Sequence, residues 1–386
     1  MLQVEGIPDR DVLRNCTTIM YVNFSPIDAA LAHPLLKKKR AMTFLENCWY
    51  AAAFSDEITR TPISRVILGE PMALYRKESG EPVALHDRCP HRFAPLHAGK
   101  VFGDAIRCPY HGLRFGPDGR CVENPVGNGH IPRAAAVPSF VLREIDGIIW
   151  LWHGTLEPDD SKLIRFKEFE QTDRWTSIEA LIPIAAAYTL VSDNLLDLSH
   201  AEFLHPDLAA EGFAKRAQLT VTQEGETVVA NNWRPAEPIS NASRLSMGGA
   251  EAPDHIDRKV EVRWDAPANM RFHMSDRPVG QHEGGTVMVA AHLITPETET
   301  TSHYFFKMAR DFLVDSEETS SKLRSIAIKA FNTEDKPMIE AQQRNIGKHS
   351  FDDLNPVLLS SDVASALSRR LLRAKLEAQV TASALR

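Results

Sequence analysis

Short apolar runs separated by turn residues dominate the chain between residues 49 and 153. Runs at 66–68, 73–75 and 83–85 are separated by Gly-Glu-Pro and Ser-Gly turns, and a longer buried run follows at 148–152. Brief apolar runs with turn signals between them are typical of strands and hairpins. The pattern therefore predicts an all-β domain in this part of the chain.

The pattern changes in the second half, where β-type runs alternate with helical segments. The β-type runs lie at 219–222, 260–264, 287–293 and 304–308. Acidic residues at 315–318 mark a helix start, and the apolar positions Leu323, Ile326, Ala327, Ala330 and Phe331 follow at helical spacing. Residues 361–377 form a final amphipathic helix. An α+β domain is expected here.

Composition shifts near residues 156–161, which are acidic and polar and include Pro158. We therefore expect one domain over residues 42–157 and a second over residues 158–386. Residues 1–41 have weak periodicity and end in the basic run 37–40. We expect this N-terminal extension to be poorly ordered.

Bulk composition restricts the class of protein. The 386 residues are 43% hydrophobic and 25% charged, which is typical of globular domains. A net charge of −7 argues against a nucleic-acid partner. No apolar stretch reaches 18 residues, so no membrane span is expected. Five cysteines without a signal peptide fit a reducing compartment, and we expect a cytoplasmic protein.

Two cysteine–histidine pairs are the strongest chemical signal. Cys89 and His91 are followed, after sixteen residues, by Cys108 and His111. Two thiolates and two imidazoles are the ligand set of a Rieske [2Fe–2S] cluster, in which the cysteines bind one iron and the histidines the other. Structural zinc is the alternative, because Cys₂His₂ sets also bind zinc. Zinc fingers, however, usually place both cysteines in the first pair.

The residues around these pairs resemble the Rieske non-haem iron oxygenases. CPHRFAPL (residues 89–96) and CPYHGLRF (residues 108–115) are similar to the cluster loops of that family. The resemblance begins at Met42 and extends to the C-terminal helix. It is strongest to the dealkylating branch, which includes oxygenases for dicamba, vanillate and chloroacetanilides. It implies a Rieske domain followed by a helix-grip-like catalytic domain with an antiparallel sheet.

A second constellation surrounds His200 and His205. Five residues apart, they do not share one helix face, so His205 is expected just past a helix end, with Pro206 directing the exit. Two imidazoles and one carboxylate form the facial triad of non-haem Fe(II) oxygenases, which leaves positions open for O₂ and substrate. The resemblance places the carboxylate at Asp335, with the neighbouring Glu334 as the alternative.

Asp197 and Asn194 receive roles from the same resemblance. Asp197 precedes His200 by three residues. In the family, an equivalent aspartate links a Rieske histidine of one subunit to an iron-bound histidine of the next. His111 would then contact Asp197 of a neighbouring chain in a ring of subunits, usually three. Asn194 falls where the family has a residue near the iron.

Substrate contacts are expected at His292, Arg271 and Ile326. The segment 291–298 is similar to the dicamba-oxidising members, in which the histidine contacts substrate. Their asparagine and tryptophan contacts would fall at Arg271 and Ile326. Arg271 can bind a carboxylate, whereas Ile326 provides an aliphatic wall. A chloroacetanilide-type herbicide or a methoxy-aromatic compound is therefore expected.

The predicted function is that of the terminal oxygenase of a multicomponent monooxygenase. It would use O₂ for oxidative O- or N-dealkylation of an aromatic compound, with aldehyde release. No nucleotide-binding glycine motif is present. Electrons would therefore come from a ferredoxin and an NAD(P)H-dependent ferredoxin reductase. The alternatives are a ring cis-dihydroxylase or other Rieske hydroxylase, or a non-catalytic Rieske electron carrier.

Overall fold

The structure is a computed structural model that describes residues 44–384 except residue 282. The expected N-terminal extension, residues 1–41, lies outside the described residues. All elements below belong to the unit that begins at Met42.

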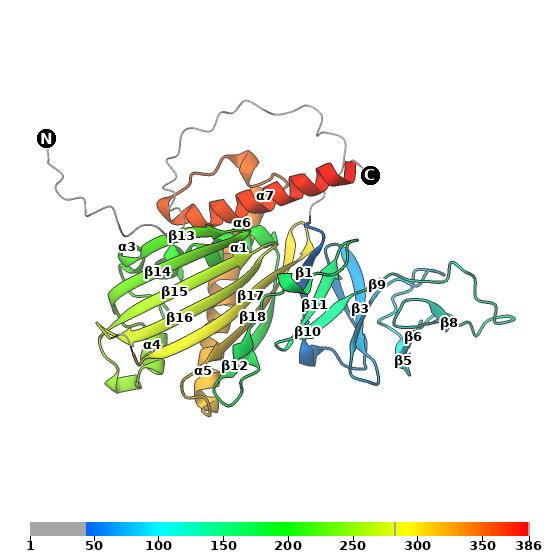
Figure 1. Cartoon of the computed structure of the whole chain (residues 1–386), viewed down its shortest axis with the longest axis horizontal. Coiled ribbons are helices and arrows are strands. Elements are labelled where there is room, and N and C mark those ends of the chain that lie inside the picture. Colours follow the sequence, from blue (N-terminus) through cyan, green and yellow to red (C-terminus); the bar gives the residue numbers. More distant parts are fainter. Residues whose placement is uncertain (1–43, 282, 385–386) are drawn as a thin grey trace, which may run out of the picture. The chain divides into compact units, whose positions relative to one another are not determined.

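The N-terminal part is built from three small antiparallel sheets (Figure 1). The first sheet has the order β1-β11-β10, with β1 at Cys48–Phe54, β10 at Leu142–Ile145 and β11 at Ile148–His153. The second has the order β2-β3-β4-β9, at Ile63–Ile67, Glu70–Arg76, Pro82–His86 and Ser139–Phe140. The third has the order β5-β6-β7-β8, at Lys100–Phe102, Ala105–Arg107, Arg114–Phe115 and Cys121–Glu123.

A seven-stranded antiparallel sheet dominates the C-terminal part, in the order β12-β18-β17-β16-β15-β14-β13. Its strands are β12 (Thr176–Ile184), β13 (Gln218–Glu224), β14 (Thr227–Pro238), β15 (His255–Asp265), β16 (Asn269–Pro278), β17 (Thr286–Thr298) and β18 (Thr301–Arg310). Strands β13 to β18 follow one another as neighbours, and β12 closes the other edge through its pairing with β18.

Helices lie against this sheet (Figure 1). They are α1 (Tyr188–Leu196), α2 (Ala201–Leu204), α3 (Phe213–Arg216), α4 (Asn241–Ser246), α5 (Glu317–Ile328), α6 (Lys336–Ile346) and α7 (Val363–Ala384). A π-helical segment, η7 (Lys329–Asp335), joins α5 to α6. Short 3₁₀ turns are η2 (Ser55–Glu57), η3 (Asp160–Lys162), η4 (Lys167–Phe169), η5 (Leu198–His200), η6 (Gly249–Glu251), η8 (Asp352–Leu354) and η9 (Ser360–Asp362).

The two faces of the large sheet have different partners. Along β17, Ala290 and Ile294 belong to the core that includes α1, whereas Val289 and Leu293 pack with β1 and β11. This alternation follows from the period of two along a strand. The N-terminal β domain therefore covers one face of β17 and β18, and the helices cover the other.

The predicted α+β class and the runs predicted as strands are confirmed. Strands β2, β3, β4, β11, β13, β15, β17 and β18 and helix α7 contain the corresponding predicted segments, apart from one or two residues at their ends. The predicted stripe from Leu323 to Phe331 begins in α5 and ends in η7. The apolar stretch at 180–191 is divided between β12 and α1. Among the residues described, none of the helices has the length and apolar character needed to cross a bilayer.

Candidate metal centres

The two cysteine–histidine loops have the same backbone design. The amide N–H groups of Phe93 and Gly112 donate to the carbonyls of Cys89 and Cys108, four residues earlier in each loop. Both residues have positive φ, 58° at Phe93 and 77° at Gly112. A Cβ at Gly112 would approach Pro125 Cγ to 2.9 Å, so only glycine suits this position. The repeated turn brings the two loops together with equivalent geometry.

Their side chains separate into a buried pair and an outer pair. Cys89 and Cys108 are 1% and 2% exposed and pack with Leu96, Ile106 and Phe115. The rings of His91 and His111 lie 4.5 Å apart, centroid to centroid. Burial raises the pKa of the Cys89 thiol to about 11, so a metal is needed to hold it as thiolate. One thiolate pair and one imidazole pair suit the two irons of a Rieske cluster.

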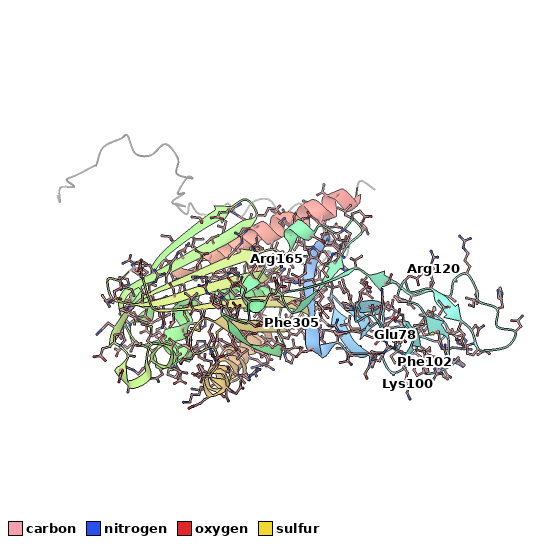
Figure 2. All side chains as sticks on the ribbon, turned by 60° about the horizontal axis from the view of Figure 1, so that its bottom comes forward. Glu78, Lys100, Phe102, Arg120, Arg165 and Phe305 are labelled. Atoms are coloured by element: carbon pink, nitrogen blue, oxygen red, sulfur yellow. The ribbon has the colours of Figure 1, made fainter. Side chains whose placement is uncertain are left out.

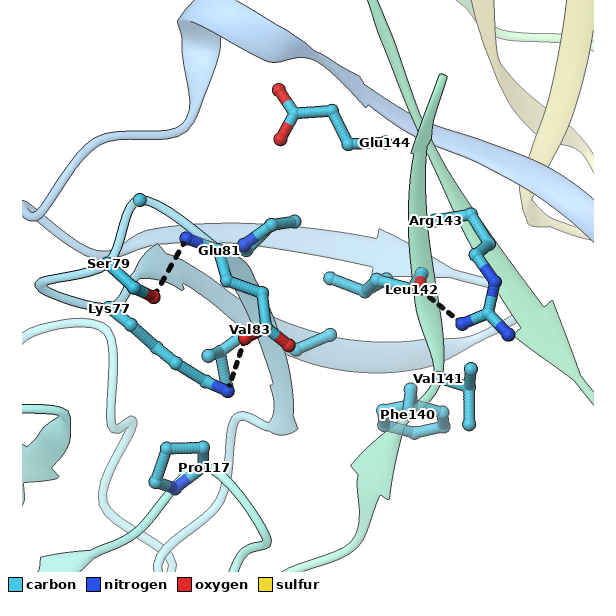
Figure 3. Close-up of a pocket in the computed structure, with 13 residues that line it drawn as sticks. Lys77, Ser79, Glu81, Val83, Pro117, Phe140, Val141, Leu142, Arg143 and Glu144 are labelled. Atoms are coloured by element: carbon cyan, nitrogen blue, oxygen red, sulfur yellow. Dashed lines mark hydrogen bonds and ion pairs between the residues drawn. The ribbon is translucent and has the colours of Figure 1, made fainter.

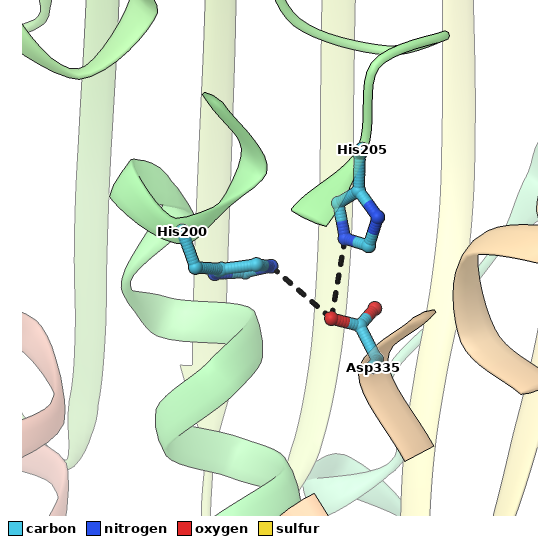
Figure 4. A group of neighbouring side chains, drawn as sticks. All are labelled: His200, His205 and Asp335. Carbon is cyan, nitrogen blue, oxygen red and sulfur yellow. Dashed lines mark ion pairs between the residues drawn. The ribbon is translucent and has the colours of Figure 1, made fainter. Parts of the chain in front are cut away.

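His200, His205 and Asp335 converge on one point (Figure 4). One ligand atom from each lies within 4.8 Å of the others. Both Nε2 atoms face the same oxygen, Asp335 Oδ1, at 3.4 Å from His200 and 3.2 Å from His205. Burial by itself would raise the pKa of Asp335, but the adjacent histidines lower it to about 2. An ionised carboxylate with two imidazoles fits a facial triad for iron.

Breaks in helical structure position all three ligands. His200 ends η5, and His205 caps α2 immediately before Pro206, as the spacing predicted. Asp335 is the last residue of π-helix η7. Pro337 has no N–H to donate to the carbonyl of residue 333, so it favours a widened turn at this point.

The outer nitrogens of both histidines are also bound. His200 Nδ1 lies 2.6 Å from the main-chain oxygen of Asp197, and His205 Nδ1 lies 2.8 Å from Glu334 Oε2. Both partners are acceptors, so each Nδ1 carries the proton and each Nε2 is free for metal. Glu334, considered as an alternative ligand, instead orients His205. Sequence alone gave no sign of this role beyond its position next to Asp335.

Asn194 lies at the triad, as expected. Its side-chain amide donates to Asp335 Oδ1 at 3.0 Å and lies 3.4 Å from His200 Nε2. Asp197 contacts His200, as expected, and does so through its main-chain oxygen, since α1 ends at Leu196. The Asp197 carboxylate instead accepts from Ser199 N–H and from Ser361 Oγ at 3.0 Å.

His292 lies on the helix side of the sheet, in a cluster of aromatic side chains. Its ring centroid is 4.2 Å from that of Phe272 and 6.0 Å from that of Phe331, which precedes Asp335 by one helical turn. Nδ1 lies 2.5 Å from Tyr304 Oη. Burial lowers the pKa of His292 to about 3, so the ring is neutral. Among the described residues its Nε2 has no hydrogen-bond partner and can meet a substrate.

The structure does not bring Arg271 to His292. Arg271 pairs with Ala291, whose side chain points to the face opposite His292, and its guanidinium binds Glu168 at 2.7 Å. A period of two puts Met270 and Phe272 on the His292 side instead. Strand β16 had not been predicted, so the face of each residue could not be assigned. Ile326 is half-buried on α5, and Phe331, in η7, is the residue whose ring lies near His292.

Comparison with known proteins agrees with both centres. Residues 48–140 match the Rieske [2Fe-2S] domain, and residues 184–378 match the vanillate O-demethylase oxygenase C-terminal domain. The oxygenase component of chloroacetanilide N-alkylformylase from Rhizorhabdus wittichii is 38% identical over 87% of this chain and 97% of its own length. The oxygenase component of dicamba O-demethylase from Stenotrophomonas maltophilia is 35% identical over 84% of this chain and 95% of its own length.

Solved structures give the same result. A crystal structure of dicamba monooxygenase bound to 3,6-dichlorosalicylic acid has a TM-score of 0.81 and 33% identity, and the match covers 87% of this chain and 99% of that one. The two domains, the Cys₂His₂ loops and the His₂Asp triad all occur on one chain. We conclude that this chain belongs to the Rieske non-haem iron oxygenases of the vanillate O-demethylase type, with a [2Fe–2S] cluster and a mononuclear iron.

Proposed function

We propose that this oxygenase removes an alkyl group from the oxygen or nitrogen of an uncharged aromatic compound, with an N-alkoxyalkyl chloroacetanilide as the preferred class. The observation that carries the proposal is the neutral cluster of aromatic side chains around His292, beside the triad. Phe272, Phe331 and Tyr304 surround that ring, and Arg271 lies on the other face of the sheet. A methoxybenzoate is the less favoured class, because Arg271 does not supply a cation for its carboxylate.

The iron, when bound, supplies the activation of O₂, and the chain supplies ligands, orientation and exclusion of water. One oxygen atom goes to the alkyl carbon bonded to the heteroatom, which in an N-alkoxyalkyl chloroacetanilide is the outer carbon of the side-chain ether. The other leaves as water, with two electrons and two protons from outside. The hydroxylated carbon then loses the aromatic product and becomes an aldehyde. His292 Nε2 is the polar group that would orient the substrate, and Asn194 would steady Asp335 through its 3.0 Å hydrogen bond.

Electrons would arrive one at a time from a ferredoxin, itself reduced by an NAD(P)H-dependent reductase. The relatives are named as oxygenase components, which supports separate electron-transfer proteins. Cysteines 48, 89, 108 and 121 are unpaired, which supports a reducing compartment such as the cytoplasm.

A homotrimer in which one subunit's cluster serves the next subunit's iron is part of the proposal. Two exposed apolar groups support it. Phe93 and Tyr110, beside the cluster histidines, are 71% and 66% exposed. Val357 and Leu359, close to the Ser361 hydroxyl that binds Asp197, are 87% and 66% exposed. Contact between the two groups would bury both and would bring His111 to Asp197 of the partner subunit.

The test is aerobic turnover with a surrogate ferredoxin and reductase. A chloroacetanilide, its N-alkyl analogue and a methoxybenzoate are compared at equal concentration, and aldehyde, diol and NADH are measured. We expect aldehyde in equal amount to dealkylated product, fastest with the chloroacetanilide. A cis-diol without aldehyde would make the enzyme a ring dihydroxylase. An absence of any oxidised product together with an empty iron site would leave only an electron carrier.

A further inference from the structure

Charge around the cluster has the opposite sign to the charge of the whole chain. The full sequence carries −7, but residues 86–133 hold seven Lys and Arg against four Asp and Glu. Two acidic proteins repel each other unless a local patch of the other sign guides them together. The cluster domain therefore carries the kind of surface that an acidic donor requires.

Three cations stand in register across the third small sheet. Lys100 on β5 is the cross-strand partner of Arg107 on β6, and Arg107 is the partner of Arg114 on β7. Like charges placed directly opposite one another destabilise a sheet. Only Arg114 is neutralised, by Glu123 at 2.8 Å. Lys100 and Arg107 have no ion pair in the part of the chain that the structure describes.

Phe102 holds the two arginines in place. The guanidinium carbons of Arg107 and Arg114 lie 4.1 and 4.7 Å from the centroid of its ring, on the same outer face as Lys100. Figure 2 shows Phe102 and Lys100 together at this end of the Rieske domain. The inner face of the same strands carries Ile106, packed around the buried cysteines. The cationic row thus sits directly over the cluster core.

A groove of about 410 Å³ connects this row to a cluster ligand. Lys100, Arg107, Arg114 and Cys108 all line it. Neither His91 nor His111 lines it, so the groove leaves the histidine pair free for the neighbouring subunit.

A second cleft on the same domain has a different character. It has a volume of about 680 Å³ and lies between the β3–β4 turn and β10 (Figure 3). Its two cations are already neutralised, Lys77 by Glu81 at 2.8 Å and Arg143 by Asp160 at 3.0 Å. No metal ligand lines it. Unpaired charge and access to the cluster therefore distinguish the groove at Cys108.

We propose that the Lys100–Arg107–Arg114 groove is the docking surface for an acidic electron-donor protein of the [2Fe–2S] ferredoxin type. This proposal rests on the proposed function and names the entry point of its electrons. Carboxylates around the donor's redox centre pair with Lys100 and Arg107, and the Phe102 ring holds the Arg107 guanidinium in position for that pairing. One electron leaves the reduced donor and reduces one ferric ion of the Rieske cluster, with no bond made or broken.

The experiment uses the full-length holoenzyme and an acidic surrogate [2Fe–2S] ferredoxin. Binding is measured by titration calorimetry at low and high salt, and anaerobic stopped-flow follows reduction of the Rieske cluster. For the variants K100E and K100Q/R107Q we expect affinity and bimolecular reduction rate to fall at least tenfold at low salt. High salt should weaken wild-type binding, because screening weakens charge pairing. The difference in affinity between wild type and the variants should therefore become smaller at high salt.

K322E is the matched control. Lys322 is exposed on α5 in the catalytic domain and is paired only with Glu318, so the variant changes net charge equally but elsewhere. We expect its affinity to stay within twofold of wild type. An equal loss in K322E, wild-type affinity in K100E, or a surrogate that binds wild type without salt dependence would each overturn the proposal.

Dithionite separates this proposal from the proposed function. This small reductant needs no docking surface, so it should reduce the cluster of K100E at the wild-type rate and give the wild-type Rieske EPR signal. If wild-type enzyme gave no Rieske signal with dithionite, the proposed function itself would fail. If the signal were normal and K100E still accepted electrons from ferredoxin at the wild-type rate, only the docking proposal would fail.

Discussion

The Rieske loops and the iron triad use similar side chains but hold them in different ways. The four cluster ligands come from two equivalent turns between residues 89 and 111, each closed by its own main-chain hydrogen bonds. The triad joins a helix break near residue 200 to a π-helix that ends at residue 335. A local site depends on turn geometry, whereas a site assembled from distant segments depends on the packing of the sheet and helices between them.

The largest effect on metal content and activity should come from variants that remove one metal centre and leave the other in place. Asp335→Ala removes the carboxylate that both Nε2 atoms face, so mononuclear iron and dealkylation should fall below detection. The cluster domain does not contribute to the triad, so the Rieske EPR signal should remain. Cys108→Ser should give the reverse pattern, with loss of the cluster signal and retention of about one iron bound per chain. Iron analysis with EPR on both variants measures this. Loss of both metal centres in either variant would mean that the two domains depend on each other for folding.

The next effect concerns the proposed connection between the centres of neighbouring subunits. Asp197→Asn is nearly isosteric: its side-chain oxygen can still accept from Ser199 N–H, and its NH₂ group can donate to Ser361 Oγ. Both metals should remain bound, while turnover should fall by roughly 100-fold, the upper range for an outer partner of a metal ligand. Single-turnover oxidation of the reduced cluster measures the transfer step directly. Asp353→Asn, which removes an exposed acid in η8, should leave the rate of this transfer unchanged. Wild-type transfer in Asp197→Asn would remove the connection.

Sequence patterns predicted these centres unequally, for physical reasons. Cys89 and His91 lie in one turn, so spacing alone identified the cluster. His205 could be placed past a helix end because Pro206 follows it. Asp335 required a family resemblance, since no local pattern distinguishes it from an exposed helix acid.

The proposed substrate contacts around His292 were the hardest part to predict. Strand β16 does alternate, with Met270, Phe272 and Met274 between Arg271, His273 and Ser275, but no strand was predicted there from the sequence. Without a predicted strand, a shift of one residue in the alignment moved the expected contact to the wrong face. Glu334 was missed for a related reason, because the π-helix turns it toward His205 while Asp335 faces the metal.

Glu334→Gln should have an intermediate effect, on the affinity of the triad for iron. It tests whether the triad, unlike the cluster turns, depends on a side chain that orients one of its ligands. The amide keeps the size of the side chain but removes the negative charge that binds His205 Nδ1 at 2.8 Å. Iron affinity should fall roughly tenfold, the lower range for such partners. Competition with a chelator measures that affinity without turnover. Glu317→Gln, an exposed acid at the start of α5, should not change it. An unchanged affinity in Glu334→Gln would limit Glu334 to a packing role.

The smallest effects test the equivalence of the two cluster turns. Gly112 and Phe93 occupy matching positions with positive φ, but only Gly112 is free of strain. Gly112→Ala forces a side chain into the left-handed region and against Pro125, so it should destabilise the cluster domain by about 1–3 kcal/mol. Phe93→Gly relieves the strain and should stabilise the domain by up to about 1 kcal/mol. The temperature at which the cluster absorbance bleaches reports both changes.

The effect of Phe93→Gly on stability also tests whether a neighbouring subunit covers Phe93. Phe93 is 71% exposed, so within one subunit its ring contributes little packing to offset its backbone strain. If the ring is covered by a neighbouring subunit, Phe93→Gly should stabilise the isolated turn yet weaken the assembly. Sedimentation velocity at low protein concentration would detect that weakening, with Val141→Gly, on an exposed position of the same domain, as the control. A gain in bleaching temperature with no change in assembly would show that the strained aromatic residue serves some purpose other than subunit contact.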